Sequence, residues 1–269
     1  MEKIIFENQL KIVDPNKKKE LEKKYKFSTN YVENFNSFRN NILDKKIIPY
    51  QVEFQAPPRE KKICWLECPY CYGLSAVDTG ERLEKGRGVE ILNQILEGGV
   101  KKIIFAGYAT DPLNCAYIED LLDLTISKKA IFGFNTKALK ISDKFFQTLT
   151  SKKIIEGSYI SLSVDAGSNN TYNKIHSIKS SSKIYDKVLN NTKKLGKIKS
   201  HNYFDLSAAY LVNINSASDY DYEKFINDFI NAGCNLLRFA FPQQPKDIKT
   251  EKGVIPTQKE VKNYLITLE

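Results

Sequence analysis

The feature that most constrains the fold is an alternation of short apolar runs with longer amphipathic segments between residues 47 and 242. The apolar runs have the length of strands and lie at residues 47–54, 100–107, 130–136, 157–166, 204–213 and 235–242. The segments between them have the length of helices and lie at residues 84–97, 115–128, 142–151, 180–195 and 219–232. Strands that alternate with helices of this length predict βαβ units and a parallel sheet. Right-handed crossovers would roll six such units into a partial or complete barrel.

Serines stand just before three of the expected helices, at Ser142, Ser180 and Ser218. A serine hydroxyl at this position accepts a hydrogen bond from a free N–H group of the first helical turn. We therefore expect these three residues to be helix N-caps.

The regions on either side of this pattern have a different character. Residues 1–46 are charged and helix-forming, with too few apolar residues to form a core alone. We expect an N-terminal helical extension over 1–46, a core barrel over 47–242 and a C-terminal helical tail over 243–269. The tail ends without a clear helix stop signal, which favours a truncated C-terminus.

The length of 269 residues and an apolar content of 42% are enough to bury a substantial core. No stretch approaches the roughly 18 consecutive apolar residues that a membrane span needs. The first twenty residues lack the pattern of a signal peptide. The sequence therefore predicts a soluble, cytoplasmic protein.

The formal net charge is +9, which raises the question of nucleic-acid binding. Several lysines come as scattered pairs, most of them beside predicted elements, as expected of a solvated surface, and the densest cluster lies at residues 17–26. The positive charge therefore has two interpretations, a solvated basic surface and a nucleic-acid site, and the pattern favours the first.

Three of the five cysteines, Cys64, Cys68 and Cys71, lie within eight residues of one another in the loop after the first predicted strand. In a parallel barrel the loops that follow the strands carry the chemistry. Three thiolates on one loop can each bind a different iron of an iron–sulfur cluster and leave a fourth iron open. A structural zinc site needs four ligands and usually shows paired C-x2-C motifs, of which the sequence has one. An iron–sulfur cluster is therefore the favoured interpretation.

The segment Cys64-Trp-Leu-Glu-Cys68-Pro-Tyr70-Cys71 resembles the signature of the radical S-adenosylmethionine (SAM) enzymes, C-x3-C-x-aromatic-C, with Tyr70 at the aromatic position. The resemblance covers roughly residues 47–242. It implies an α/β fold, a partial (β/α)6 TIM-like barrel of the radical SAM type, here with an N-terminal helical extension. It also implies one 4Fe-4S cluster on the three cysteines, with Tyr70 as a residue that contacts SAM.

The same resemblance implies an activity and its partners. The open iron would bind the amino and carboxylate groups of SAM, and reduction would cleave SAM to methionine and a 5′-deoxyadenosyl radical that abstracts hydrogen from a substrate. Such an enzyme is oxygen-sensitive and needs a reducing partner such as a flavodoxin or a ferredoxin.

Further SAM-binding residues are implied at the end of the second strand, where the family has a Gly-Gly-Glu stretch that meets the methionine amino group. This sequence keeps Gly107 and has Thr110 and Asp111 downstream, so the glycine pair is lost and Asp111 takes the place of the acid. The open alternative is that Asp111 caps a helix beginning near Asn114.

Polar residues alternate on the fourth predicted strand at Ser161, Ser163 and Asp165. Side chains two residues apart on a strand point to the same face, here expected to be the barrel interior. The resemblance implies that Ser163 and Asp165 contact the ribose or the methionine carboxylate, and that Asn213 contacts the adenosine. A polar core layer satisfied by neighbouring strands is the alternative.

Four other residues each have a functional and a simpler interpretation. His176 could exchange a proton near the site or be a hydrogen-bonded loop residue. Cys115 and Cys234 could be thiol hydrogen donors or ordinary semi-buried cysteines. Arg238, within an apolar strand, could bind a substrate carboxylate or belong to a structural ion pair.

The leading hypothesis for the substrate is a peptide or protein side chain, because the cysteine loop is similar to that of peptide-modifying relatives. An RNA-modifying or DNA-repair enzyme is an alternative that depends on the basic residues at 17–26. A non-catalytic iron–sulfur binding or regulatory protein is a third, supported by the loss of the Gly-Gly-Glu stretch.

Overall fold

The structure, a computed structural model, describes residues 40, 43–44, 48–57, 64, 66, 68, 70–71, 83–107, 110–213, 216 and 219–241. The chain divides into two compact units, Met1–Tyr50 and Gln51–Glu269. Apart from residues 40, 43 and 44, the helical extension predicted for 1–46 lies outside the described residues. The tail predicted for 243–269 lies entirely outside them.

The second unit contains one sheet of six parallel strands, five of them inside the predicted apolar runs and β1 ending one residue beyond its run. The strands are β1 Gln51–Gln55, β2 Lys102–Ala106, β3 Ile131–Thr136, β4 Tyr159–Ser163, β5 Asp205–Leu211 and β6 Leu236–Ala240. They pair in chain order, so β1 and β6 are the two edge strands of an open sheet. The predicted α/β class and parallel sheet are confirmed.

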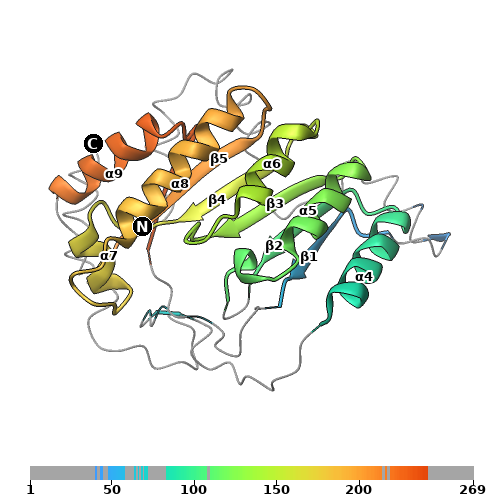
Figure 1. The fold of residues 1–269 in the computed structure, drawn as a ribbon, viewed down its shortest axis with the longest axis horizontal. Helices are drawn as coiled ribbons and strands as arrows, with labels where there is room; N and C mark the ends of the chain where they lie inside the picture. The colour runs from blue at the N-terminus through green and yellow to red at the C-terminus, as the bar shows by residue number, and fades with distance from the viewer. Residues whose placement is uncertain are drawn as a thin grey trace. The chain divides into compact units, whose positions relative to one another are not determined.

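Helices connect these strands. They are α4 Lys85–Glu97, the short 3-10 helix η2 Pro112–Asn114, α5 Ile118–Ser127, α6 Asp143–Ser151, α7 Asn169–Ile175, α8 Ile184–Lys199 and α9 Asp219–Asn231. Right-handed crossovers between parallel strands in sequential order place every helix on the same face of the sheet. Figure 1 shows α5, α6 and α8 side by side across this face, and the contacts run in the order α4, α5, α6, α8, α9.

The core lies between the sheet and this helical layer. The rings of Phe105 and Phe134 stack with centroids 4.8 Å apart, and Phe134 meets Phe145 of α6 edge-on at 5.2 Å. Burial of each such ring contributes about 1.5–3 kcal/mol. On the other face of the sheet, Asn135 and Arg238 are exposed. The strands are thus apolar toward the helices and polar on the opposite face.

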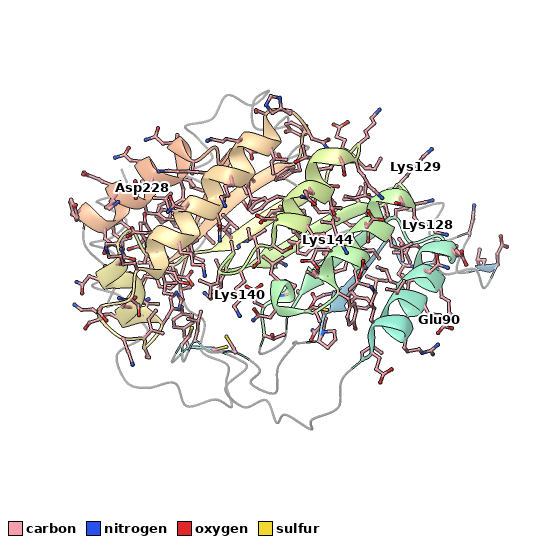
Figure 2. All side chains as sticks on the ribbon, in the orientation of Figure 1. Glu90, Lys128, Lys129, Lys140, Lys144 and Asp228 are labelled. Carbon is pink, nitrogen blue, oxygen red and sulfur yellow. The ribbon has the colours of Figure 1, made fainter. Side chains whose placement is uncertain are left out.

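Asp120 in the first turn of α5 links three neighbouring helices. Its carboxylate lies 2.8 Å from Lys85 Nζ of α4 and 2.9 Å from Lys144 Nζ of α6. Figure 2 shows Lys144 among the side chains on this helical face. Because the two lysines are largely exposed, each ion pair contributes little, typically below about 1 kcal/mol.

The N-cap predictions have three different outcomes. Ser142 caps α6, where its hydroxyl accepts a hydrogen bond from the N–H of Phe145. Ser218 lies outside the described residues. The prediction for Ser180 is wrong, because α8 begins only at Ile184. The amide of buried Asn173 donates to the carbonyls of Ser180 and Ser182, and this interaction keeps the segment out of the helix.

The sequence did not predict α7, which follows β4 and begins after Ser168. The Ser168 hydroxyl accepts a hydrogen bond from the N–H of Thr171 and caps the helix. The helix is short and polar, so its sequence lacks a long apolar period. Its buried residues Tyr172 and Ile175 are held by tertiary contacts.

No helix within the described part of the chain is long and apolar enough to cross a membrane.

Candidate functional site

The carboxyl ends of the strands bring together most of the residues singled out from the sequence. Cys68 and Tyr70 follow β1, Asp111 follows β2, and Asp165 follows β4. Lys137, for which the sequence leaves open a position facing substrate or solvent, follows β3. In folds of parallel strands, the loops at this edge are the usual place for ligand binding.

The cysteine loop presents its thiols close to these groups. The N–H of Cys71 donates to the carbonyl of Cys68 at 3.0 Å and closes a turn between them. Cys68 is buried, whereas Cys64 and Cys71 are half-buried. Burial raises the pKa of the Cys68 thiol to about 11 against the opposing effect of the Lys137 ammonium, and Asp165, Cys71 and Cys64 add to the rise. The thiols of Cys64 and Cys71 therefore both lie within electrostatic reach of Cys68, and a bound cationic centre would favour the thiolate forms of all three.

Three cysteine thiols on one loop are a donor set that an iron–sulfur cluster can use. Among the described residues, no group of three His, Cys, Asp or Glu side chains is arranged to hold one ion. The three cysteine ligands of a cluster bind different irons, so they lie farther apart than the ligands of one zinc ion.

His176 ends α7 directly beside the cysteine loop. Its Nδ1 lies 3.0 Å from Cys68 Sγ and 3.3 Å from the Tyr70 hydroxyl. Its Nε2 is buried, has no hydrogen-bond partner among the described residues, and lies 3.9 Å from Asp165 Oδ2. Burial and then the Lys137 ammonium lower the pKa of His176 to about 3, against the effect of Asp165, so the imidazole is neutral. Of the two interpretations of His176, that of a hydrogen-bonded residue agrees with the structure. Its hydrogen-bond partner is Cys68, a candidate cluster ligand.

A buried ion pair joins the loops after β3 and β4. Lys137 Nζ lies 2.9 Å from Asp165 Oδ2, and the Tyr70 hydroxyl donates to the same oxygen at 3.2 Å. Burial alone would raise the pKa of Asp165, but Lys137 and its hydrogen bonds hold this pKa below its usual value. The site therefore contains a carboxylate that stays charged although it is buried.

Asp165 reaches this position through a turn, and the predicted strand over 157–166 is wrong at this end. The strand ends at Ser163, and Asp165 has a φ of 66°, in the left-handed region that is unfavourable for a residue with a Cβ. The N–H groups of Val164 and Asp165 both donate to the carbonyl of Ala209, which fixes the turn. Ser163 remains in the strand, and its carbonyl accepts from Lys137 Nζ at 3.4 Å.

Asp111 is the N-cap of η2, so the capping alternative is confirmed, although the helix is a 3-10 turn that begins before Asn114. The carboxylate accepts hydrogen bonds from the N–H of Leu113 at 2.9 Å, the hydroxyl of Thr136 at 2.8 Å and the N–H of Lys137 at 2.6 Å. Burial raises the pKa of Asp111 against these hydrogen bonds. A contact with a SAM ammonium group would have to use the acceptor capacity that these three donors leave.

The loop after β2 requires a glycine at position 107, because the backbone of Thr110 packs closely against it. A Cβ at this position would lie 2.2 Å from the carbonyl oxygen of Thr110, closer than any real contact. Thr110 is thereby brought to the site edge, where its buried Oγ1 has no hydrogen-bond partner among the described residues.

Asn213 lies at the same edge, at the end of β5. It is buried, and its N–H donates to the hydroxyl of Ser216 at 2.9 Å. The Ser216 hydroxyl in turn donates to the carbonyl of Leu211 at 3.0 Å. The turn after β5 is therefore held by its own hydrogen bonds.

The remaining candidates are less closely tied to the site. Cys115 and Cys234 are both buried, which matches their simpler interpretation, and Cys234 precedes β6, at the opposite edge of the sheet. Arg238 is exposed, and no ion pair involving it occurs within the described part of the chain.

Two buried hydroxyls and one ring nitrogen at the site have no hydrogen-bond partner among the described residues. They are Thr110 Oγ1, the Tyr172 hydroxyl and His176 Nε2. Burial raises the pKa of Tyr172, with further electrostatic effects of Lys137, Asp165, Cys68 and Asp111, so this hydroxyl lies among the site's charged groups. Buried polar atoms without partners are costly and are typical of a site that a polar ligand completes.

Comparison with known proteins gives structural but no sequence matches. No protein-family model and no curated protein matches the chain. SuiB from Streptococcus suis, solved with bound S-adenosylmethionine, has a TM-score of 0.60 and 16% identity, and the match covers 94% of this chain and 59% of SuiB. This chain has the fold of radical SAM enzymes.

Two other structures agree. For anSMEcpe with bound AdoMet the TM-score is 0.58 and the identity 17%, with 82% of this chain and 57% of that chain covered. HemN, the coproporphyrinogen III oxidase of Escherichia coli, is a radical SAM enzyme. Its TM-score is 0.51 and its identity 11%, and the match covers 90% of this chain and 58% of HemN. The chain spans less than two thirds of the length of each of these structures. The predicted radical SAM type of partial barrel is confirmed at the level of the fold.

Proposed function

We propose that the chain is a radical SAM enzyme with one 4Fe-4S cluster on Cys64, Cys68 and Cys71. The observation that carries this proposal is a loop with three cysteines, two of whose thiols act electrostatically on that of Cys68, at the carboxyl edge of a sheet with the radical SAM fold. When bound, the cluster supplies the electron that cleaves SAM to methionine and a 5′-deoxyadenosyl radical.

The chain's own residues would bind and orient SAM around this loop. The unpaired hydroxyls of Thr110 and Tyr172 offer hydrogen bonds to its polar groups. The charged Asp165 offers acceptors to its ammonium or ribose hydroxyls, and Tyr70 supports this carboxylate through its hydroxyl. Gly107, Asp111, Ser163 and Asn213 complete the proposed SAM-binding set, mainly by shaping the loops after β2, β4 and β5.

We propose a peptide or protein side chain as the substrate. A second structure of SuiB, bound to its precursor peptide SuiA, matches 98% of this chain with a TM-score of 0.62. That neighbour supports a peptide as the first substrate class to test. Peptides encoded beside the gene should gain or lose mass when they are incubated with the enzyme, and an unchanged mass for all of them would argue against this substrate class.

The remaining elements of the proposal follow from this chemistry. The barrel core would cover residues 47–242, flanked by helical segments, and a cytoplasmic flavodoxin or ferredoxin would supply the electron. The basic residues at 17–26, which motivated the nucleic-acid alternative, lie outside the described residues, and the described part gives no separate support for RNA or DNA.

The decisive experiment is anaerobic reconstitution with iron and sulfide, followed by dithionite and SAM. We expect 5′-deoxyadenosine in amounts that depend on dithionite. A chain that forms the cluster but produces no 5′-deoxyadenosine would overturn the enzymatic proposal and favour a binding or regulatory protein.

A further inference from the structure

The contact between His176 and Cys68 joins two elements that are 108 residues apart in the sequence. His176 Nδ1 lies 3.0 Å from Cys68 Sγ, well inside the range for hydrogen bonds to sulfur. Both side chains are buried, with exposed fractions of 0% and 5%. In such a poorly solvated place a hydrogen bond is electrostatically stronger than in water.

The direction of this hydrogen bond depends on the state of the cysteine. A protonated thiol can donate to the imidazole. A thiolate that binds iron has no proton to donate, so only an N–H group on Nδ1 can make the bond. Which nitrogen of a neutral imidazole carries the proton follows from its partners.

The surroundings of His176 suit this tautomer. Nδ1 faces the sulfur, whereas Nε2 makes no hydrogen bond to another described residue and lies 3.9 Å from Asp165 Oδ2. The backbone of Val164 also interacts with the ring. The hydroxyl of Tyr70, which also lies near Nδ1, has Asp165 as an alternative acceptor at 3.2 Å. The Tyr172 ring packs on the imidazole with centroids 4.2 Å apart and limits its rotation.

We propose that His176 donates an Nδ1–H hydrogen bond to the thiolate of Cys68 in the cluster-loaded protein and thereby makes the cluster easier to reduce. This inference rests on the proposed function. Hydrogen bonds to the sulfurs are among the factors that set the potential of an iron–sulfur cluster. The added electron increases the negative charge on the sulfur, so the hydrogen bond is stronger in the reduced state. His176 is therefore a positioning residue for cluster reduction.

The test measures the reduction potential of the reconstituted cluster without SAM, by dye-mediated titration followed by electron paramagnetic resonance. His176→Leu removes the donor and keeps an apolar side chain in the buried site. We expect its cluster to have a reduction equilibrium constant about tenfold lower, which is about 59 mV more negative for one electron. His201, the other histidine of the chain, is exposed at the end of α8, and His201→Leu is the matched control.

Two conservative variants separate the hydrogen bond from simple packing. The amide nitrogen of asparagine can occupy the place of Nδ1, whereas that of glutamine reaches the place of Nε2. His176→Asn should therefore restore most of the potential, and His176→Gln should not. This pair also decides the matter if His176→Leu does not fold.

The potentials of the four variants can have three informative outcomes. A lowered potential in His176→Leu and His176→Gln, with values near wild type in His176→Asn and His201→Leu, supports the inference. A cluster whose potential is the same in all four variants overturns the inference and leaves the proposed function standing. A wild-type chain that takes up no cluster overturns both.

Discussion

At the scale of single residues, the assignment of three cysteines and not five as ligands gives the first prediction. Replacing Cys64, Cys68 or Cys71 with alanine should abolish the brown absorbance of the reconstituted protein, because each thiolate binds its own iron. Cys115→Ala and Cys234→Ala are matched controls, because both residues are buried in the core. These two should keep the absorbance and lose some stability. Equal behaviour of all five variants would refute the assignment.

The buried pair of Lys137 and Asp165 leads to a second prediction. Removing one partner of a buried ion pair leaves the other charge uncompensated, which typically costs about 3–5 kcal/mol. Lys137→Met should therefore lower the free energy of unfolding by about that amount in urea titrations. Lys140→Met changes an exposed lysine of the same loop (Figure 2) and should cost less than about 1 kcal/mol, because water screens the interactions of an exposed charge. A similar loss in both variants would indicate that the ion pair is not the cause.

The same pair predicts how stability depends on pH. Because Lys137 holds the pKa of Asp165 below its usual value, ionised Asp165 stabilises the folded state. This contribution is fully present above the ordinary pKa of about 3.9 and is lost as the pH falls through the lowered folded value. The stability difference between wild type and Asp165→Asn should thus be larger at pH 7 than at pH 3 in urea titrations. A difference that does not depend on pH would contradict the ionised state of Asp165.

At the scale of elements, α9 fixes the segment from the turn at Asp165 to α7, whose C-cap is His176. Buried Asp221 of α9 accepts hydrogen bonds from the Gly167 N–H, the Thr171 hydroxyl and the Tyr210 hydroxyl, each at 2.7 Å. The approach requires a glycine, because a Cβ at Gly167 would lie 1.8 Å from the Asp221 carbonyl oxygen. The position of α7 thus depends on a contact with an element 50 residues later in the chain.

Asp221→Asn tests this link. The asparagine amide has N–H groups where the carboxylate had an acceptor oxygen, so it faces at least one of the three donors with another donor and loses that hydrogen bond. Loss of a hydrogen bond to a charged group costs about 1.5–3 kcal/mol. We expect a fall of that size in the free energy of unfolding and faster hydrogen exchange at the amides of Gly167 and Thr171. Glu223→Gln removes an exposed carboxylate from the same helix and serves as the control. Unchanged exchange in Asp221→Asn would show that the loop is held by other contacts.

The elements also show what the sequence can and cannot predict. Each apolar run contains one strand, apart from the last residue of β1, because a parallel strand buried against helices needs a continuous apolar segment. The short helix α7 escaped prediction, since its stability comes from Asp221 and from buried Tyr172. The pairing of Lys137 with Asp165 also escaped prediction, because it depends on a left-handed turn that places Asp165 outside β4. The cysteine ligands were predictable because their spacing is local.

At the scale of the whole molecule, the proposed site draws on loops after β1, β2, β3, β4 and β5, so a ligand bound there would connect segments from residue 64 to residue 213. A ligand that binds only the folded state stabilises it by mass action, by about 2.7 kcal/mol at a concentration of 100 times its Kd. In a chain of this size, each kcal/mol raises Tm by about 2–4 °C.

SAM should therefore raise the Tm of the reconstituted protein by several degrees in anaerobic calorimetry, because it would bind the open iron and the polar groups of several loops together. Cys68→Ala, treated in the same way, lacks one cluster ligand and should show a much smaller increase, since SAM could then use only the contacts with protein groups such as Thr110 and Asp165. An increase of equal size in the two proteins would mean that SAM binding does not depend on the cluster, and the cysteine loop would then need another role.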